Sequence, residues 1–231
     1  MAALSSRPLA EVQRRVTEVH HQRDLQQQLR FYNGWAKDYD QDVAVLQYQA
    51  PSLAAAFLAS IFQGSPENAL VLDVACGTGL VAQELQAKGF RHFHGLDGSQ
   101  EMLEHAQHKG LYEDLKLCLL GQGTLPAPEG SYDATVIVGA LSEGHVPSGV
   151  IPQLLLVTKP DWCAWLSSLN AMCYLNVVNL NDLEQQGLWE KVGMQEVEKW
   201  ERATSHQESD QGSDYISGVV YIYRKKIKSL V

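Results

Sequence analysis

Cysteine is scarce in this sequence, and its spacing excludes the common cysteine-based sites. The 231 residues contain four cysteines, Cys76, Cys118, Cys163 and Cys173, and none of them belongs to a Cys-x-x-Cys pair. Zinc sites usually need such closely spaced ligands. We therefore expect no metal, and we expect reduced, packed thiols of the kind found in cytoplasmic or nuclear proteins.

Long hydrophobic runs are also missing. The first eight residues contain no extended apolar stretch and so predict no signal peptide. No other run reaches the roughly 20 apolar residues that cross a bilayer as a helix. The expected location is the cytoplasm, with the nucleus as the alternative, and no membrane partner is expected.

Positive charge is the third scarcity. Lysine and arginine number 18 against 27 aspartates and glutamates, which gives a net charge of −9. Proteins that bind nucleic acids neutralise phosphates with cationic side chains. The composition thus argues against a nucleic-acid substrate, which leaves a small molecule or a protein side chain as the expected acceptor. The protein is expected to be a monomer.

The most informative segment that is present spans residues 69–80. Its apolar run includes one acidic residue, Asp73, and breaks into a turn of small residues, Ala75, Cys76, Gly77 and Gly79. A helical pattern follows at once. The order predicts a strand, a nucleotide-binding turn and a helix, and it also fits the loose dinucleotide fingerprint Gly-x-Gly-x-x-Ala.

Asp73 discriminates between two kinds of nucleotide ligand. A carboxylate at the end of this strand would repel a pyrophosphate in a partly desolvated crevice. A ligand whose tail carries an ammonium group has the opposite preference. Asp73 therefore favours S-adenosylmethionine over a nicotinamide dinucleotide.

The string from Val71 to Gly79 resembles motif I of the class I S-adenosylmethionine-dependent methyltransferases. The resemblance implies S-adenosylmethionine as the cofactor, S-adenosylhomocysteine as the product, and Asp73 as the residue that holds the methionine end. An ordinary buried strand followed by a glycine turn is the alternative. The resemblance extends over most of the chain, from about Phe31 to Arg224.

A second acidic landmark, Asp97, ends the next predicted strand and precedes Gly98. A carboxylate one strand–helix–strand unit after the first can accept both ribose hydroxyls. Ser99 then begins a helix as its cap. The resemblance implies that a side chain near Met102 packs on adenine, although Met102 is equally well explained as a core residue of the helix.

The third motif, around residues 115–126, departs from the family pattern. Most relatives place an aspartate after the first glycine of this loop, where it accepts a hydrogen bond from adenine, and this chain has Gln122. A glutamine carbonyl can still accept that bond without the charge. The backbone of Gly123 is expected to contact the adenine ring, as in the family.

A fourth strand is predicted over residues 132–138. It ends at Gly139 and Ala140, small residues that would admit the methionine end of the ligand or, alternatively, the close packing of the next helix. Glu143 and His145 follow and either face the methyl acceptor or are ordinary loop residues.

Aromatic residues precede motif I. The stretch 31–40 looks like the segment that covers the ligand pocket in small-molecule methyltransferases, and it contributes Tyr32, Trp35 and Tyr39 as candidate ligand contacts. Plain core packing is the alternative for each of them.

The predicted fold class is α/β, a doubly wound, mostly parallel seven-stranded sheet of the Rossmann-like methyltransferase type. Residues 1–66 are expected to form an N-terminal helical cap, and residues 67–231 the cofactor-binding domain, which ends in an antiparallel hairpin. Strands are expected at 162–169, 194–204 and 215–224, with helices at 42–62, 151–157 and from 181.

Three functions from different classes remain open at this point. The first is a methyltransferase with an unidentified acceptor and no assigned catalytic residue. The second is a nonenzymatic binder of S-adenosylmethionine that acts through a partner, which the missing adenine aspartate would suit. The third is a nicotinamide-dependent oxidoreductase, which Asp73 opposes.

Overall fold

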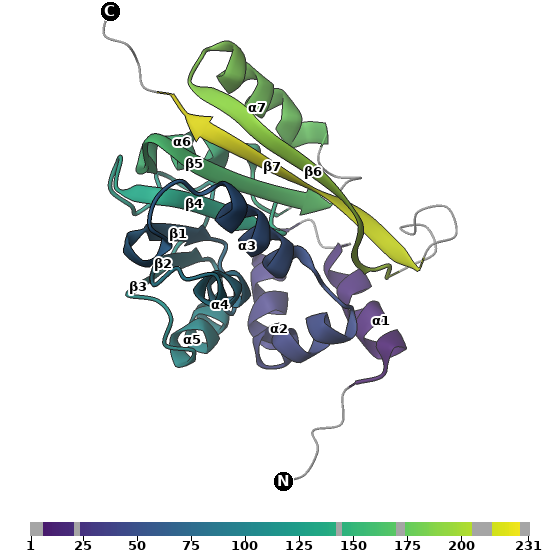
Figure 1. Ribbon diagram of the computed structural model, residues 1–231. Helices are drawn as coiled ribbons and strands as arrows, with labels where there is room; N and C mark the ends of the chain where they lie inside the picture. Colours follow the sequence, from purple (N-terminus) through teal and green to yellow (C-terminus); the bar gives the residue numbers. More distant parts are fainter. Residues whose placement is uncertain (1–6, 21–23, 142–144, 170–173, 205–213, 227–231) are drawn as a thin grey trace, which may run out of the picture.

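Strands and helices alternate along most of the chain (Figure 1). The computed structural model describes residues 7–20, 24–141, 145–169, 174–204 and 214–226. The strands are β1 (Leu70–Val74), β2 (His92–Asp97), β3 (Asp114–Leu117), β4 (Tyr132–Val138), β5 (Thr158–Leu169), β6 (Trp189–Arg202) and β7 (Tyr215–Lys225). The helices are α1 (Leu9–His20), α2 (Leu25–Val45), α3 (Ala50–Ile61), α4 (Leu80–Ala87), α5 (Gln100–His108), α6 (Ile151–Val157) and α7 (Tyr174–Gln185).

The strands lie in the order β3-β2-β1-β4-β5-β7-β6. β1 to β5 are parallel, and β7 runs antiparallel to both β5 and β6. This arrangement confirms the predicted Rossmann-like fold with a closing antiparallel hairpin. The strand order reverses between β1 and β4, and such a switch point opens a crevice at the carboxyl ends of the strands.

A hydrophobic core lies on each face of the sheet, and β1 contributes side chains to both. Val71 packs with the side chains of α3 and α4 on one face. Leu72 and Val74 pack with α6 and α7 on the other. Apolar residues on both sides of a strand are typical of parallel sheets covered by helices.

The N-terminal helices divide between two environments. α1 and α2 form a small core of their own around Trp35, with Val12 and Val16 from α1. α3 instead joins the sheet core through Ala54 and Leu58. The division at residue 66 stays a prediction, since α3 shares its core with β1.

The helical stretch expected over residues 42–62, with Pro51 early in its second part, is divided between two helices. α2 ends at Val45, and α3 begins at Ala50 with Pro51 in its first turn. Proline lacks an N–H and fits the first turn of a helix, where that group has no partner.

The entry to β5 shows how the chain accommodates the missing glycines. Asp161 has a φ of +64°, a left-handed conformation that glycine adopts easily and aspartate tolerates better than most residues. β5 also begins at Thr158, four residues earlier than predicted, and its register with β4 shifts between Tyr132 and Ala134.

Two further elements begin earlier than expected. α7 starts at Tyr174 rather than near residue 181. β6 starts at Trp189 because its first residues pair with the end of β7, and the Trp189 ring lies 5.3 Å from that of Tyr223. Pairing with a distant strand is a tertiary effect that local sequence does not encode.

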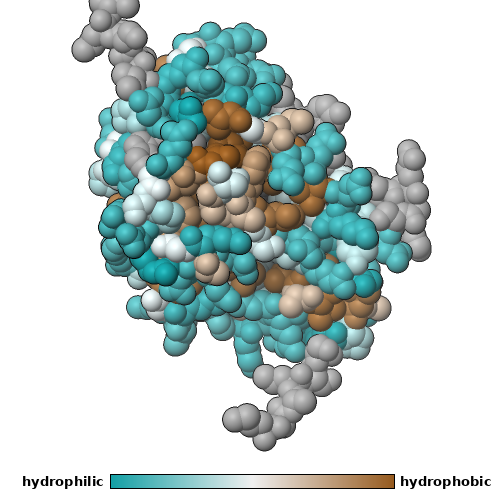
Figure 2. Space-filling model, in the orientation of Figure 1, coloured by the Kyte–Doolittle hydropathy of each residue, from teal (hydrophilic) through white to brown (hydrophobic). Residues whose placement is uncertain are grey.

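The face seen in Figure 1 is hydrophilic around its rim, while hydrophobic residues gather near its middle (Figure 2). Among the described residues, no single helix has the length and hydropathy of a membrane span. The bent pair formed by α2 and α3 passes that test only when the two helices are joined.

Candidate functional site

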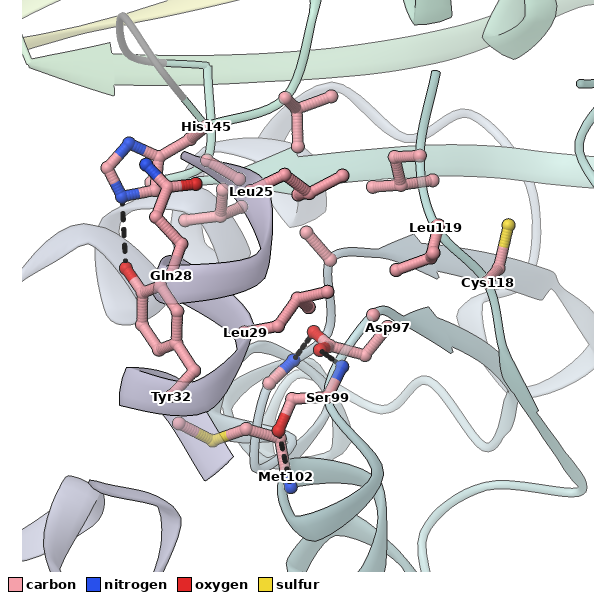
Figure 3. A pocket seen from close by; sticks show the side chains of 18 of the residues that line it. Leu25, Gln28, Leu29, Tyr32, Asp97, Ser99, Met102, Cys118, Leu119 and His145 are labelled. Atoms are coloured by element: carbon pink, nitrogen blue, oxygen red, sulfur yellow. Dashed lines mark hydrogen bonds between the residues drawn. The ribbon is translucent and has the colours of Figure 1, made fainter. Parts of the chain in front are cut away.

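A cavity lies at the carboxyl ends of β1, β2 and β4, beneath α2 (Figure 3). It comprises about 850 Å³ of space between protein atoms, part of which is open to solvent. Nine of the predicted cofactor contacts line it: Tyr32, Tyr39, Ala75, Gly77, Asp97, Gly98, Met102, Gly139 and Ala140.

The turn after β1 presents its backbone to this cavity. Ala75 and Gly77 both have positive φ, +57° and +54°, and the Cys76 N–H donates to the Leu96 carbonyl at 3.0 Å. A left-handed alanine is strained by about 1 kcal/mol, so surrounding contacts must hold it. The turn is therefore fixed to the end of β2.

Asp97 is the main polar group of the cavity. Its two oxygens each accept a 2.8 Å hydrogen bond, one from the Gly77 N–H and one from the Ser99 N–H. Burial raises the pKa of this carboxyl, and the backbone N–H groups of Ser99, Gly77 and Gly98 act in the opposite direction. An ionised carboxylate has about four acceptor sites, so Asp97 can accept further hydrogen bonds from the hydroxyl groups of a ligand.

Met102 follows from α5, whose first turn Ser99 caps. The Met102 N–H donates to the Ser99 hydroxyl oxygen at 3.2 Å. The thioether lines the cavity although Met102 is only 2% exposed. Met102 is therefore a core residue of α5 that also borders the cavity, so its position is compatible with both the core interpretation and the adenine contact.

α2 is held over the cavity by polar contacts with other elements. The Ser99 hydroxyl donates to Asn33 at 2.5 Å, and the Thr78 hydroxyl donates to Asp40. Lys109, just beyond α5, lies 2.7 Å from the same Asp40 carboxylate. These contacts join α2 directly to the turn after β1 and to α5.

Two tyrosine hydroxyls border the cavity near the end of β4. Tyr39 and Tyr48 line both the main cavity and a smaller hollow beside it, which Cys76 also lines. Burial raises the pKa of both phenols, so they stay protonated and act as hydrogen-bond donors. A Cβ atom on Gly139 would lie 2.1 Å from the Tyr48 hydroxyl oxygen, so this close approach requires glycine.

His145 enters the cavity from the loop after β4. Its Nε2 lies 3.1 Å from the hydroxyl of Tyr32 on α2 (Figure 3). Gln28, one turn earlier on α2, points toward the same region. Glu143, the other residue expected near the acceptor, lies outside the described residues.

Asp73 does not line the cavity. It is buried behind the turn, where the Tyr112 hydroxyl donates to its Oδ2 at 2.7 Å. Burial raises the pKa of Asp73 to about 7, while the bond from Tyr112 lowers it. This location differs from the direct contact with a ligand ammonium group that the sequence suggested.

Five other predicted contacts lie outside the main cavity, and one of them, Cys76, lines only the smaller hollow. Trp35 points into the α1–α2 core and donates to Asp42 at 2.8 Å. Gly79 packs on Tyr112, and the carbonyl of Gly123 accepts from Gln153. Gln122 lines only an adjoining depression, here called the mouth, which shares Leu25, Leu120, His145 and Val146 with the cavity.

Several lining residues were not expected from the sequence. They are Leu25, Gln28, Leu29, Tyr48, Ser99, Cys118, Leu119, Leu120, Val138 and Val146. Leu25, Leu29 and Tyr32 recur at four- and three-residue steps along α2, a signal that marks one face of a helix. That signal does not say whether the face meets a core or a cavity.

Comparison with known proteins agrees with this architecture. The family model described as a methyltransferase domain matches residues 71–161. Methyltransferase-like protein 27 of Homo sapiens is 52% identical over 195 residues, which cover 82% of this chain and 79% of the relative. The sequence also resembles the methyltransferase-like protein of the Williams-Beuren syndrome chromosomal region, in the stretches 33–35 and 139–142, and the name of the human relative agrees with it.

Other relatives match a smaller part of the sequence, and the solved structures are similar in fold alone. The 18S rRNA (guanine(1575)-N(7))-methyltransferase of Saccharomyces cerevisiae is 37% identical over 71 residues, 31% of this chain and 26% of that protein. The TehB-like S-adenosylmethionine-dependent methyltransferase of Corynebacterium glutamicum aligns with a TM-score of 0.56 at 14% identity, over 84% of this chain and 99% of that one. Taken with the cavity at the switch point, the match to the human relative shows that this chain belongs to the class I S-adenosylmethionine-dependent methyltransferases.

Proposed function

We propose that this protein binds S-adenosylmethionine in the cavity under α2 and transfers its methyl group to a small molecule. The observation that carries the proposal is Asp97, a carboxylate fixed by two backbone N–H groups at the edge of the cavity. Carboxylates in this position of a strand–helix–strand unit bind ribose hydroxyls.

The residues present suit each part of this cofactor. Asp97 would accept the ribose hydroxyls, and Met102 with Leu119 would contact adenine from two sides. The hydroxyls of Tyr39 and Tyr48 would donate to the methionine carboxylate, since neither hydroxyl makes a hydrogen bond to another of the described residues. Gly77 would allow the backbone to approach the ligand closely.

Asp73 has an indirect role in this proposal. Its contact with Tyr112, which itself packs against Gly79, supports the turn from behind. In its ionised form, which a cationic ligand would stabilise, Asp73 also favours a cationic ligand over an anionic one, because the local dielectric is low. The proposal therefore keeps the expected preference of Asp73 for S-adenosylmethionine but not a direct bond.

The chemistry of transfer places few demands on the chain. Bound S-adenosylmethionine supplies an electrophilic methyl group. The protein would align the acceptor for in-line displacement and exclude water, with α2, His145 and Val146 bordering the cavity.

The acceptor is proposed to be a small molecule because the site has little positive charge. Among the residues described, no lysine or arginine lines the cavity or its mouth. The whole chain carries a net charge of −9. A nucleic acid needs cations for its phosphates, so we do not extend the substrate of the yeast rRNA methyltransferase to this chain.

Labelled S-adenosylmethionine, incubated with the purified protein and a fractionated cell extract, tests the proposal. We expect the label in the small-molecule fraction, with less label from Asp97→Asn when S-adenosylmethionine is kept below saturation. Label in RNA alone would contradict the proposed substrate class. Binding of the cofactor without any transfer would favour the nonenzymatic binder.

A further inference from the structure

The outer part of the cavity differs in character from the part around Asp97. Leu25, Leu29, Leu120 and Val146 make its walls apolar. Its polar groups are neutral or weakly basic, namely the Gln28 amide, the Tyr32 hydroxyl and the His145 imidazole (Figure 3). Such a lining suits an uncharged apolar molecule with a single polar group to orient it.

The Tyr32–His145 pair provides a route for a proton out of this apolar region. In the tautomer with hydrogen on Nδ1, His145 Nε2 accepts from the Tyr32 hydroxyl across 3.1 Å. Burial raises the pKa of Tyr32, so this phenol keeps a proton and can pass one on rather than act as a base itself. His145, a half-buried residue at the cavity mouth, is the base at the end of the route.

We propose that the methyl acceptor is a small apolar molecule with an acidic hydroxyl, a phenol or an enol, and that Tyr32 relays its proton to His145. This inference rests on the proposed function. The acceptor oxygen forms a bond to the methyl carbon, and the carbon–sulfur bond breaks with its electron pair left on sulfur. The hydroxyl proton passes to Tyr32 as Tyr32 passes its own to His145 Nε2.

This step leaves the total charge of the cavity unchanged. The positive charge on the sulfonium disappears as the methyl group leaves, and an equal charge appears on the imidazolium. A change of net charge in an apolar cavity is costly, because the charge loses its hydration. The relay therefore suits a site that has no lysine or arginine among its described lining residues.

The acidity of the acceptor follows from the strength of the base. General-base catalysis works best when donor and base differ little in pKa. A histidine has an ordinary pKa of about 6.5 and a phenol one of about 10, whereas water and alkyl alcohols lie near 16. A phenolic or enolic hydroxyl is thus the oxygen acceptor that this pair can deprotonate.

Three probes of the same shape separate the acceptor classes. 2-Naphthol, naphthalene-2-thiol and 2-naphthylamine share one ring system and differ in the acceptor atom. We expect the full-length protein to form the methyl ether of 2-naphthol at least tenfold faster than it methylates the amine. The thiol, which ionises without help, is expected to be insensitive to the variants below.

The relay itself is tested by Tyr32→Phe and His145→Gln, with His105→Gln on the exposed side of α5 as the matched control. Both relay variants should lower kcat for 2-naphthol at pH 7 by about 100- to 10,000-fold. Their activity should recover toward the wild-type value near pH 10, where the naphthol ionises by itself. Binding of S-adenosylhomocysteine should change less than threefold.

The outcomes separate this inference from the proposed function. Binding of S-adenosylhomocysteine with methylation of the thiol, the amine or an extract macromolecule, but not of 2-naphthol, would overturn the acceptor class alone. So would binding with no methylation of any probe. Equal naphthol rates in wild type and His145→Gln would overturn the relay, and absence of cofactor binding would overturn the proposed function.

Discussion

Oδ2 of Asp97 accepts the N–H of Gly77 at 2.8 Å, which joins the end of β2 to the turn after β1. Two strands that are neighbours in the sheet are thereby locked where the cavity opens. The bond orients the carboxylate before any ligand arrives. Preorganisation of this kind lowers the entropy lost on binding.

Asp97→Asn should weaken the binding of S-adenosylhomocysteine by about 10- to 100-fold. Hydrogen bonds to a charged group contribute about 1.5–3 kcal/mol, and an amide offers one acceptor where the carboxylate offers two. Isothermal titration calorimetry measures the change. Asp114→Asn on the edge strand β3 is the matched control and should bind like wild type; equal affinities for both variants would contradict the role of Asp97.

Gly139→Ala should narrow the cavity and reduce affinity for the same ligand by at least tenfold. The new Cβ would lie 2.1 Å from the Tyr48 hydroxyl oxygen, and the φ of +72° disfavours alanine. The same contact should also lower the melting temperature. Adding Tyr48→Phe removes that oxygen and should recover part of the lost stability, leaving the backbone strain and a 3.3 Å approach to the ring carbon Cζ. No recovery in thermal melting would show that the contact with Tyr48 is not the cause.

Gly34→Ala, unlike Gly139→Ala, should stabilise the protein. Gly34 lies exposed within α2, and a Cβ there would meet nothing within 4 Å. Alanine should stabilise the protein by about 0.5–1 kcal/mol in urea unfolding, since glycine loses more conformational entropy in a helix. A destabilised Gly34→Ala protein would contradict the helical geometry of α2 at this point.

More of the fold than of the site could be predicted from the sequence. Buried parallel strands such as β1 and β4 are continuous apolar runs, and the turn with Gly77 and Gly79 has a local signature. The early start of β6 depends on pairing with β7, which is distant in sequence. Long-range pairing of this kind leaves little trace in a local pattern.

Within the site, backbone-defined positions were easier to predict than side chains. Gly77, Asp97 and Gly139 line the cavity because the ends of neighbouring parallel strands must meet. Trp35 has the same periodicity on α2 as Tyr32 and Tyr39, yet it faces the α1–α2 core. A pattern of three and four residues identifies a buried face without showing what that face contacts.

Trp35→Phe should destabilise the protein by about 1–3 kcal/mol in urea unfolding. The indole N–H donates at 2.8 Å to Asp42, a fully buried carboxylate; phenylalanine removes this donor, and Asp42 keeps only its bonds from Arg7 and Arg15. Tyr215→Phe, which removes a hydroxyl bonded to Gln47 at an exposed position, is the control and should cost less than about 0.5 kcal/mol. Equal losses in the two variants would contradict the buried contact.

Asp73 should make stability depend on pH in the direction opposite to that of most carboxylates. Its pKa rises from 3.8 to about 7 on burial, so between those values the folded protein binds a proton that the unfolded chain does not. The stability that Asp73 contributes therefore falls as pH increases from about 4 to 7. The three-unit shift sets an upper limit of roughly 4 kcal/mol on this change.

Asp73→Asn tests that dependence because asparagine stays neutral. Relative to wild type, the variant should gain stability as the pH of the thermal melting experiment rises from 4.5 to about 7, and the difference should then level off toward pH 8. Tyr112→Phe should move the transition to higher pH, since the lost bond lowers the pKa of Asp73 in the wild type. A difference between Asp73→Asn and wild type that is constant across this range would rule out a buried, proton-binding Asp73.

Calorimetric titration of the full-length protein with S-adenosylmethionine, S-adenosylhomocysteine and NAD tests the central claim most directly. We predict that the first two bind at one site per chain, that Asp97→Asn weakens both, and that NAD gives no heat of binding. Binding of NAD, or no binding of either S-adenosyl compound, would contradict the assignment of this cavity.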